Sequence, residues 1–246
     1  MKKDYHIHTK YSYDSCIDAD TLLIDAIANG YSDIAITEHL DLLPQELSLY
    51  GLPSLNQYRE YIRALQLKHP SIGLQMGIEI GDFHQVREFA TNLISGFDFF
   101  PILGSVHFLS DHTNVAIPMP NKLTTHQVLD YYEQNLSLVS ECDIDVLAHL
   151  GVYKRYYPEA PDESFALSLI KEVFRKMISK GIALELNFSA YRKPYKSILP
   201  DPGYLKLYSE MGGYLFTIGS DAHHIDHFDK HYHHAISYLP EGAQLL

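Results

Sequence analysis

The sequence predicts a single α/β domain, residues 1–246, built as a barrel of parallel strands. Its 246 residues are ordinary for one such barrel. Short apolar runs alternate with segments of helical periodicity, which indicates a parallel sheet with right-handed crossovers. Almost every apolar run also ends in a residue type that binds metals. An open sheet concentrates its site at one switch point, whereas barrel strands converge on one mouth. We therefore predict a seven-stranded, TIM-like barrel with a metal site at the C-terminal ends of its strands.

The first half of the chain contains four predicted strands and three helices. The first helix is apolar-periodic and closes at Asn29-Gly30, a typical helix stop. Gly and Pro residues mark the other junctions. The strands are residues 4–8, 33–37, 73–80 and 97–106, and the helices between them are residues 19–28, 55–68 and 85–95.

The second half continues the alternation with three more strands. Thr124 is predicted to cap a helix that runs to Glu141, and a charged amphipathic helix opens at Pro161 to Glu163 and ends at Gly181. A short helix over 202–211 separates the last two strands. The strands are residues 145–148, 182–186 and 214–218, and three long loops, 41–53, 110–123 and 152–162, are expected to wall the pocket.

Composition narrows the possible partners and environment. The formal charge of -12, from 31 acidic and 19 basic residues, opposes binding to nucleic acid, because that affinity depends on Lys and Arg neutralising phosphates. Cys16 and Cys142 are far apart, which predicts neither a disulfide framework nor a thiolate zinc site. No signal-like or membrane-spanning apolar stretch is found. We expect a soluble, cytoplasmic protein that uses no membrane, and the oligomeric state is left open.

Two pairs of residues have the spacing of metal-ligand pairs on strands. Residues two apart on a strand point to the same face, so His6/His8 and Asp221/His223 each form a bidentate pair. Imidazole and carboxylate ligands suit zinc, manganese or iron. Glu79 lies in an apolar strand, where an unpaired charge is costly. A carboxylate there needs a cation and is able to bridge two.

Further ligand candidates follow the other strands. His107 and His149 each close an apolar run; either alone would be read as a core histidine, but together they suit a second metal. His39 is interpreted as a ligand or a phosphate-contacting imidazole. Asp14 lies on a loop, where an Asx-turn is the alternative. The other histidines are expected to be solvated: His69, His84, His112, His126, His224, His227, His231, His233 and His234.

The ordered motifs resemble those of the PHP (polymerase and histidinol phosphatase) superfamily. The resemblance is carried by His6-Ile7-His8, Thr37-Glu38-His39, Gly104-Ser105-Val106-His107 and Gly219-Ser220-Asp221-Ala222-His223. The segments around Glu79, His149, residues 185–189 and 192–194 are similar to the phosphatase branch of that superfamily rather than the polymerase-associated branch.

The resemblance implies a distorted (β/α)7 barrel that holds three divalent metal ions. The first would be bound by His6, His8, Glu79 and Asp221, the second by Glu79, His107 and His149, and the third by Asp14, His39 and His223. Many relatives carry a histidine near the position of Asp14, so this ligand departs from the commonest pattern. Glu38 is expected behind the ligands.

The resemblance also implies a small phosphorylated substrate, and the phosphatase branch points to L-histidinol phosphate in histidine biosynthesis. Phosphomonoester hydrolysis needs an acidified water and positive charge around the phosphoryl oxygens. We assign Arg155 to those oxygens because a guanidinium matches phosphate bidentately; a surface salt bridge is the alternative, and Arg192 is the second choice. His39 is expected to contact the substrate, and His223 or a water to supply the proton to the leaving group.

The walls around a cationic, aromatic substrate are expected to be acidic and aromatic. The candidates are Glu38, Asp41, Tyr153 and Tyr156. Two alternatives to this function stay open. One is another phosphoesterase, acting on a sugar phosphate or nucleotide or as an exonuclease, although the acidic charge opposes the exonuclease. The other is a non-catalytic metal-binding barrel.

Overall fold

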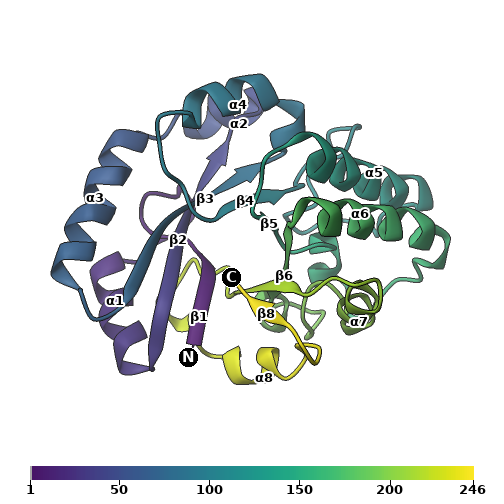
Figure 1. Cartoon of the computed structure of the whole chain (residues 1–246). Helices are drawn as coiled ribbons and strands as arrows, with labels where there is room; N and C mark the ends of the chain where they lie inside the picture. The colour runs from purple at the N-terminus through teal and green to yellow at the C-terminus, as the bar shows by residue number, and fades with distance from the viewer. Residues whose placement is uncertain (1) are drawn as a thin grey trace.

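The computed structural model describes residues 2–246 and contains one curled sheet of parallel strands with helices around its outside (Figure 1). Each strand pairs with its neighbours in chain order, so the topology is that of a barrel. The strands are β1 (Lys2–Ile7), β2 (Tyr31–Asp41), β3 (Gly73–Gly81), β4 (Ile102–Ser105), β5 (Val146–Leu147), β6 (Ala183–Asn187), β7 (Leu215–Gly219) and β8 (Gln244–Leu245).

The helices confirm most of the predicted pattern. Thr124 caps α5 in a capping box with Gln127, and Gly181, at φ +69°, ends α6 as expected. The helices are α1 (Ala19–Ala28), α2 (Pro44–Tyr50), α3 (Leu55–Lys68), α4 (Arg87–Ile94), α5 (Thr125–Glu141), α6 (Leu167–Lys180), α7 (Pro202–Glu210) and α8 (Tyr232–Ile236). Short 3-10 helices are η1 (Phe83–Gln85), η2 (Val152–Tyr156), η3 (Ser164–Ala166), η4 (Ser189–Arg192) and η5 (Ile225–His227).

The barrel closes differently at its two ends. At the end where the strands finish, β1 meets the chain after β7: the His8 amide donates to Ala222 O at 3.0 Å and the Asp221 amide to His6 O at 2.8 Å. At the opposite end β8 pairs with the start of β7. Seven strands therefore surround the mouth, as predicted. The eighth was missed because a two-residue strand leaves no apolar run to detect.

Other differences from the prediction lie in the loops and at element ends. The predicted loop 41–53 contains α2, which Pro44 begins at a position where proline is favoured. The strand predicted over 97–106 is reduced to 102–105, and the helix expected from 161–163 begins only at Leu167, after η3. The loop over 152–162 contains η2. These segments carry short or irregular structure that hydrophobic periodicity does not resolve.

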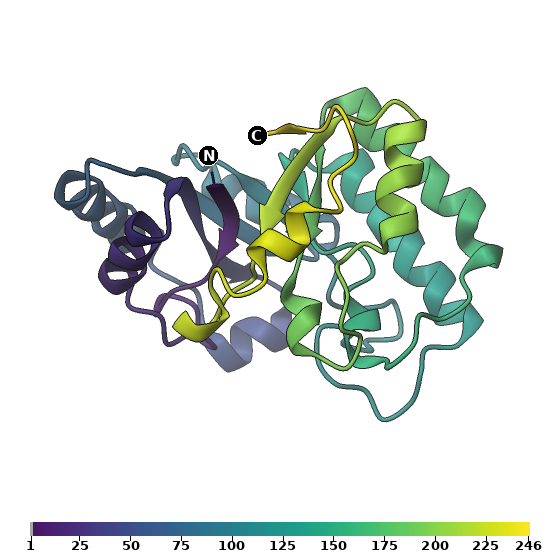
Figure 2. The same ribbon diagram turned by 90° about the horizontal axis from the view of Figure 1, so that it is seen from below.

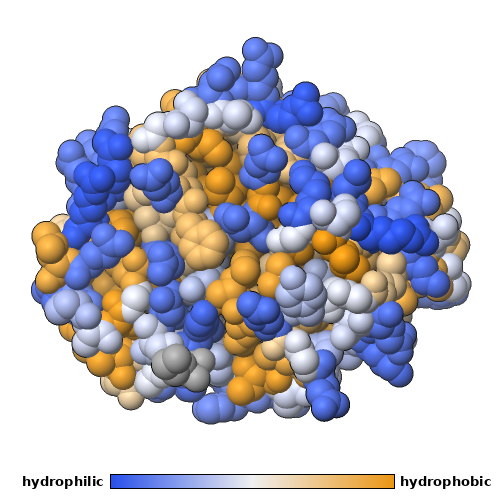
Figure 3. All heavy atoms as spheres, viewed as in Figure 1, coloured by the Kyte–Doolittle hydropathy of each residue, from blue (hydrophilic) through white to orange (hydrophobic). Residues whose placement is uncertain are grey.

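Burial separates an outer core from an inner one. Helices pack on the outside of the sheet through residues such as Leu22, Ile62 and Phe174, all almost fully buried. A smaller inner cluster, formed by Leu103, Val146, Ala148 and Ala183, is separate from this core. Polar side chains cover much of the face in Figure 3, between apolar patches. Figure 2 shows the two ends of the chain side by side. Among the described residues no helix is both long and apolar enough to cross a membrane.

Candidate metal centre

Strand ends and the loop after β1 bring all nine predicted ligands into one cluster at the mouth of the barrel. In the register of β2 and β3, His39 lies directly opposite Glu79. The bridge between β1 and the chain after β7 brings the His6/His8 pair beside the Asp221/His223 pair. Three groups have donor atoms within 4.8 Å of one another: His6 with His8 and Asp221; His6 with Glu79 and His149; and His8 with His39 and His223.

Glu79 is the centre of this cluster. Its side chain is 1% exposed, and its two oxygens face five imidazoles. Oε1 lies 2.9 Å from His149 Nε2 and 3.7 Å from His107 Nε2. Oε2 lies 3.0 Å from His39 Nδ1, 3.4 Å from His6 Nε2 and 3.5 Å from His8 Nε2. The two oxygens thus face different groups of histidines, which is the arrangement a bridging carboxylate requires.

Several buried atoms in the cluster have no hydrogen-bond partner. They include His6 Nε2, His8 Nε2 and Glu79 Oε2, which point toward one another. Buried polar atoms are normally paired, so a group of unpaired ones calls for an ion. Their separations of 3.4 and 3.5 Å match the spacing of about 3.4 Å between tetrahedral ligands held on bonds of about 2.1 Å. The donor set therefore fits a divalent metal.

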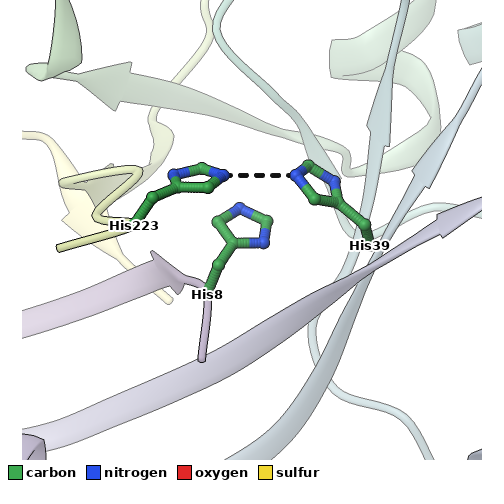
Figure 4. A group of neighbouring side chains, drawn as sticks. All are labelled: His8, His39 and His223. Atoms are coloured by element: carbon green, nitrogen blue, oxygen red, sulfur yellow. Dashed lines mark hydrogen bonds between the residues drawn. The ribbon is translucent and has the colours of Figure 1, made fainter. Parts of the chain in front are cut away.

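A second group is formed by His8, His39 and His223, whose rings lie together in Figure 4, and Asp14 lies beside it. The ring of His8 stacks on His39 at 4.1 Å and on His223 at 4.2 Å. The Nε2 atoms of His39 and His223 lie 3.2 Å apart, and Asp14 oxygens lie 3.5 Å and 3.3 Å from them. The structure thus brings Asp14 to the histidines, which an isolated Asx-turn would not explain.

The electrostatics of the cluster suit cation binding. Burial lowers the pKa of His107 to about 3, so its imidazole is neutral, as a metal ligand must be. Burial alone would raise the pKa of Glu79, but the neighbouring charge on His6 and hydrogen bonds from His149 and His39 hold that pKa well below its usual value. The carboxylate is therefore ionised at neutral pH.

Glu185 is a candidate functional residue that the sequence analysis missed. It is 1% exposed on β6, and its Oε1 accepts from His6 Nδ1 at 2.7 Å while Oε2 accepts the His149 amide. The first bond leaves His6 Nε2 free for a metal. Gly219 makes room for this carboxylate, since a Cβ there would lie 1.9 Å from Glu185 Oε1. A carboxylate inside an apolar strand, as at Glu79, is the signal that could have identified it.

The two predicted arginines lie close to the cluster. Arg155 Nη1 lies 3.1 Å from Asp221 Oδ2, its Nη2 donates to Ala116 O at 2.7 Å, and its Nε donates to Tyr156 OH at 3.2 Å. Arg192 Nη2 donates to Ser220 O and Asp221 O, whereas its buried Nη1 has no partner. Arg155 is thus not a surface salt bridge, and Arg192 still has donor capacity.

The four residues predicted to wall the substrate pocket lie in different places, and only one of them lines the cavity. Glu38 lies behind the ligands, where it accepts from Thr9 and Ser12, and does not line the cavity. Tyr153 was a wrong prediction: it is fully buried and donates to Glu163. Asp41 is buried beside His39 and His107, 3.8 Å from each, and only Tyr156 lines the cavity.

The remaining histidines divide into two groups. Those exposed as predicted are His112, His126, His224, His233 and His234. The prediction was wrong for His227, which lines the cavity, and for His69, His84 and His231, which are partly buried. His69 contacts Asp20 at 2.6 Å, His84 contacts Gln134, and His231 stacks on Tyr191.

The cavity above the cluster has two lobes that share one junction. The junction is formed by Asp14, Ala116, Arg155, Asp221 and His223, which line both lobes. The acidic lobe has a volume of about 260 Å³ and adds Glu46, Glu79 and the stacked rings of Tyr13 and Tyr50, 3.5 Å apart. The basic lobe, about 320 Å³, adds Arg192, Lys193 and His227.

Glu46, on α2, was also missed because its segment was predicted as a loop. It is 7% exposed, its Oε2 has no partner, and burial raises its pKa to about 8, with a further contribution from Asp41. The Glu46 carboxyl is therefore largely protonated at neutral pH, and a cation bound beside it would lower its pKa and favour the ionised form.

Comparison with known proteins identifies the family of this chain. The model of the PHP domain matches residues 4–189, and the chain belongs to this family. It is 27% identical to a Clostridium acetobutylicum protein named "Probable histidinol-phosphatase", over 100% of this chain and 95% of that protein. It is 28% identical to the "Histidinol-phosphatase" of Lactococcus lactis, over 91% of this chain and 85% of that protein.

Solved structures share the fold. The histidinol phosphate phosphatase of Lactococcus lactis, complexed with zinc, L-histidinol and phosphate, superposes with a TM-score of 0.84 at 24% identity and covers 100% of this chain and 95% of that one. A structure from Listeria monocytogenes superposes with a TM-score of 0.80 at 16% identity, covering 95% and 99%. The distorted barrel is confirmed.

Proposed function

We propose that this protein is a metal-dependent phosphomonoesterase that hydrolyses L-histidinol phosphate to L-histidinol and phosphate. The observation that carries the proposal is the two-lobed cavity, in which a cluster of metal-ligand residues and Arg155 meet an acidic lobe. The curated relatives bear the name of this activity, and the Lactococcus lactis enzyme was solved with L-histidinol, phosphate and zinc. This reaction places the protein in histidine biosynthesis.

Three divalent metal ions are proposed to bind at the mouth. His6, His8, Glu79 and Asp221 would hold the first, Glu79, His107 and His149 the second, and Asp14, His39 and His223 the third. The unpaired atoms of His6, His8 and Glu79 support the first of these sites. Zinc suits the mixture of imidazole and carboxylate ligands, as do manganese and iron. When bound, such ions lower the pKa of water and neutralise charge on the phosphoryl oxygens.

The phosphoryl group is proposed to lie at the junction of the two lobes. Arg155 lines both lobes there, and its guanidinium is held by Asp221, Ala116 and Tyr156 before any substrate binds. A donor fixed in this way loses little entropy on binding phosphate. His39 borders the acidic side of the junction, and Arg192 borders the basic side.

The cationic end of the substrate is proposed to enter the acidic lobe. Histidinol carries an amine and an imidazole, and a positive charge on either group would lower the raised pKa of Glu46 and favour its ionised form. The stacked Tyr13 and Tyr50 provide an aromatic wall. The basic lobe would repel the same groups through Arg192 and Lys193. Charge thus selects one orientation, with the leaving oxygen toward the acidic lobe.

For that leaving oxygen the proposed proton source is a water or, when its Nε2 does not bind the third metal, His223. It lines both lobes, and its Nδ1 faces Asp221 O at 3.1 Å, so that Nε2 points toward Asp14 and His39. Its side chain is 24% exposed, more than His6 or His8, which are almost fully buried. This exposure allows proton exchange with solvent.

The experiment is an assay of the metal-replete protein against L-histidinol phosphate, p-nitrophenyl phosphate, sugar phosphates and 5′-nucleotides. We expect L-histidinol phosphate to have the highest kcat/KM. Equal or better turnover of a nucleotide or sugar phosphate would identify another phosphatase, and no turnover of any member would indicate a binding protein.

Two variants make the assay specific to the geometry. Glu46→Gln should raise KM for L-histidinol phosphate about tenfold or more, the value of a lost charge-assisted hydrogen bond, and leave p-nitrophenyl phosphate unaffected. The exposed Glu60→Gln on α3 is the matched control. Arg155→Ala should lower kcat/KM for both substrates by at least about tenfold and weaken phosphate inhibition, with metal content unchanged. Arg155→Lys should recover only part of the loss.

A further inference from the structure

A buried ionic cluster lies directly behind the cleft. Lys154, on η2, is 0% exposed, and its ammonium donates to both Glu163 and Asp201. Glu163 also accepts from the hydroxyls of three tyrosines, Tyr132 at 2.9 Å, Tyr204 at 2.8 Å and Tyr153. The Lys154 ammonium lies 4.7 Å over the ring of Tyr204. None of these residues lines either lobe of the cavity, so the cluster does not contact the substrate.

The cluster connects four separate segments of the chain. Tyr132 belongs to α5, Glu163 immediately precedes η3, and Asp201 and Tyr204 form the start of α7. Lys154 joins them all to η2. An uncompensated charge buried here would be costly, so each partner restrains the others. The backbone of η2 is thereby held from the side opposite the cleft.

Arg155, the next residue, extends toward the cleft. Its guanidinium reaches Asp221, whereas the Lys154 side chain runs the other way and packs over Gly151, where a Cβ would lie 3.2 Å from Lys154 Cε. The same turn is held at its start by Tyr131, whose hydroxyl accepts the Gly151 amide at 2.8 Å. Displacement of Lys154 would move the peptide bond it shares with Arg155.

We propose that the cluster of Lys154, Glu163 and Asp201 positions Arg155 in the cleft. Lys154 is a positioning residue: its ion pairs fix η2, and η2 fixes the direction of the guanidinium. This inference rests on the phosphate role proposed above for Arg155. The proposal explains why the fully buried Lys154 directly precedes Arg155, whose guanidinium lies in the cleft.

The test is a double-mutant cycle on the metal-loaded protein with L-histidinol phosphate as substrate. Lys154→Met keeps the length of the stem and removes the charge. It should lower kcat/KM by about 10- to 100-fold, because misplacement of a binding group by about 1 Å has effects of that size, and it should weaken inhibition by inorganic phosphate. In the Arg155→Ala background the same substitution should have almost no further effect.

Hydrogen exchange of residues 151–157 is the second readout and does not require turnover. Exchange there should rise in Lys154→Met and stay unchanged in Lys206→Met, the matched control for an exposed ion pair on α7. Should Lys154→Met fail to fold, Asp201→Asn removes one of the two carboxylates and should produce smaller changes of the same kind.

Two results would overturn the proposal. One is unchanged exchange in residues 151–157. The other is an equal loss of kcat/KM in the Arg155→Ala background, which would show a general effect on folding. If the wild-type protein hydrolyses no phosphomonoester, the proposed function fails, while the exchange result still decides whether Lys154 orders η2.

Discussion

Replacement of Gly219 by alanine tests how the barrel supports its metal ligands. The added Cβ would lie 1.9 Å from Glu185 Oε1 and 2.7 Å from His6 Cβ. Non-bonded carbon and oxygen atoms approach to about 3.3 Å, so the carboxylate must retreat by about 1 Å or more. Its hydrogen bond to His6 Nδ1, now 2.7 Å, would then exceed hydrogen-bonding distance.

Gly219→Ala is expected to lower stability through overpacking and to lower metal affinity because His6 loses its hydrogen bond to Glu185. Overpacking should cost about 1–3 kcal/mol of unfolding free energy in the metal-free protein. Loss of the carboxylate behind a metal-bound histidine should weaken metal binding about 10- to 100-fold, or about 1.4–2.7 kcal/mol. Because Glu185 also accepts the His149 amide, a single methyl group disturbs two ligands.

The assay is zinc affinity by competition with a chromophoric chelator, with urea unfolding of the metal-free protein measured in parallel. Gly203→Ala is the matched control, because a Cβ there meets nothing within 4 Å and the position is helical. It should bind zinc normally and gain about 0.4–1 kcal/mol. Wild-type zinc affinity in Gly219→Ala would refute the assignment of Glu185 as the support of His6.

Three further substitutions test other parts of the site. Glu79→Gln removes the charge that five imidazoles face, so the bound metal measured by elemental analysis and the turnover should both be largely lost, while the circular dichroism spectrum stays unchanged. Near-normal metal content would contradict the bridging role. Asp14→Ala should lose about one metal per chain and impair catalysis, and unchanged stoichiometry would favour the Asx-turn. Burial raises the pKa of Asp4 from 3.8 to about 7, so the folded state binds its proton more tightly than the unfolded state, and stability falls as pH rises from about 4 to about 7. Asp4→Asn lacks this pH dependence. In urea unfolding of the metal-free protein, the unfolding free energy of the variant relative to wild type should therefore increase by about 4 kcal/mol between pH 4 and pH 7. A difference that does not change with pH would show that Asp4 is ionised throughout.

Elements with a strong local signal were predicted closely. The bounds of α1 and α3 agree with their apolar periodicity, and the capping signals at Thr124 and Gly181 were sufficient to place one end each of α5 and α6. The short elements α2 and β8 were not predicted. A two-residue strand such as β8 is stabilised by pairing with β7, which local sequence does not encode.

The candidate ligands were visible because strand ends and i, i+2 spacing are local properties that a barrel converts into one site. Glu185 and Glu46 were not visible for a different reason. Glu185 acts through His6, which lies 179 positions away in the chain and meets it only across the barrel. Glu46 lies in a segment that was predicted as a loop. Conversely, Tyr153 lies in the predicted loop 152–162, two residues before Arg155, but is fully buried and contacts Glu163 instead of the cavity.

The sequence by itself determined the barrel class, the clustering of nine ligand residues and the acidic character of the chain. Periodicity, spacing and charge can be read from the order of residues along the chain without knowing which segments meet. Only the tertiary structure decided that Glu185 supports two ligands from behind, that Glu46 enters the cavity and which way each residue of η2 points. Those properties depend on distances between segments that are far apart in sequence. Burial makes them matter, since an unpaired charge is tolerated in solvent but must find a partner inside the protein.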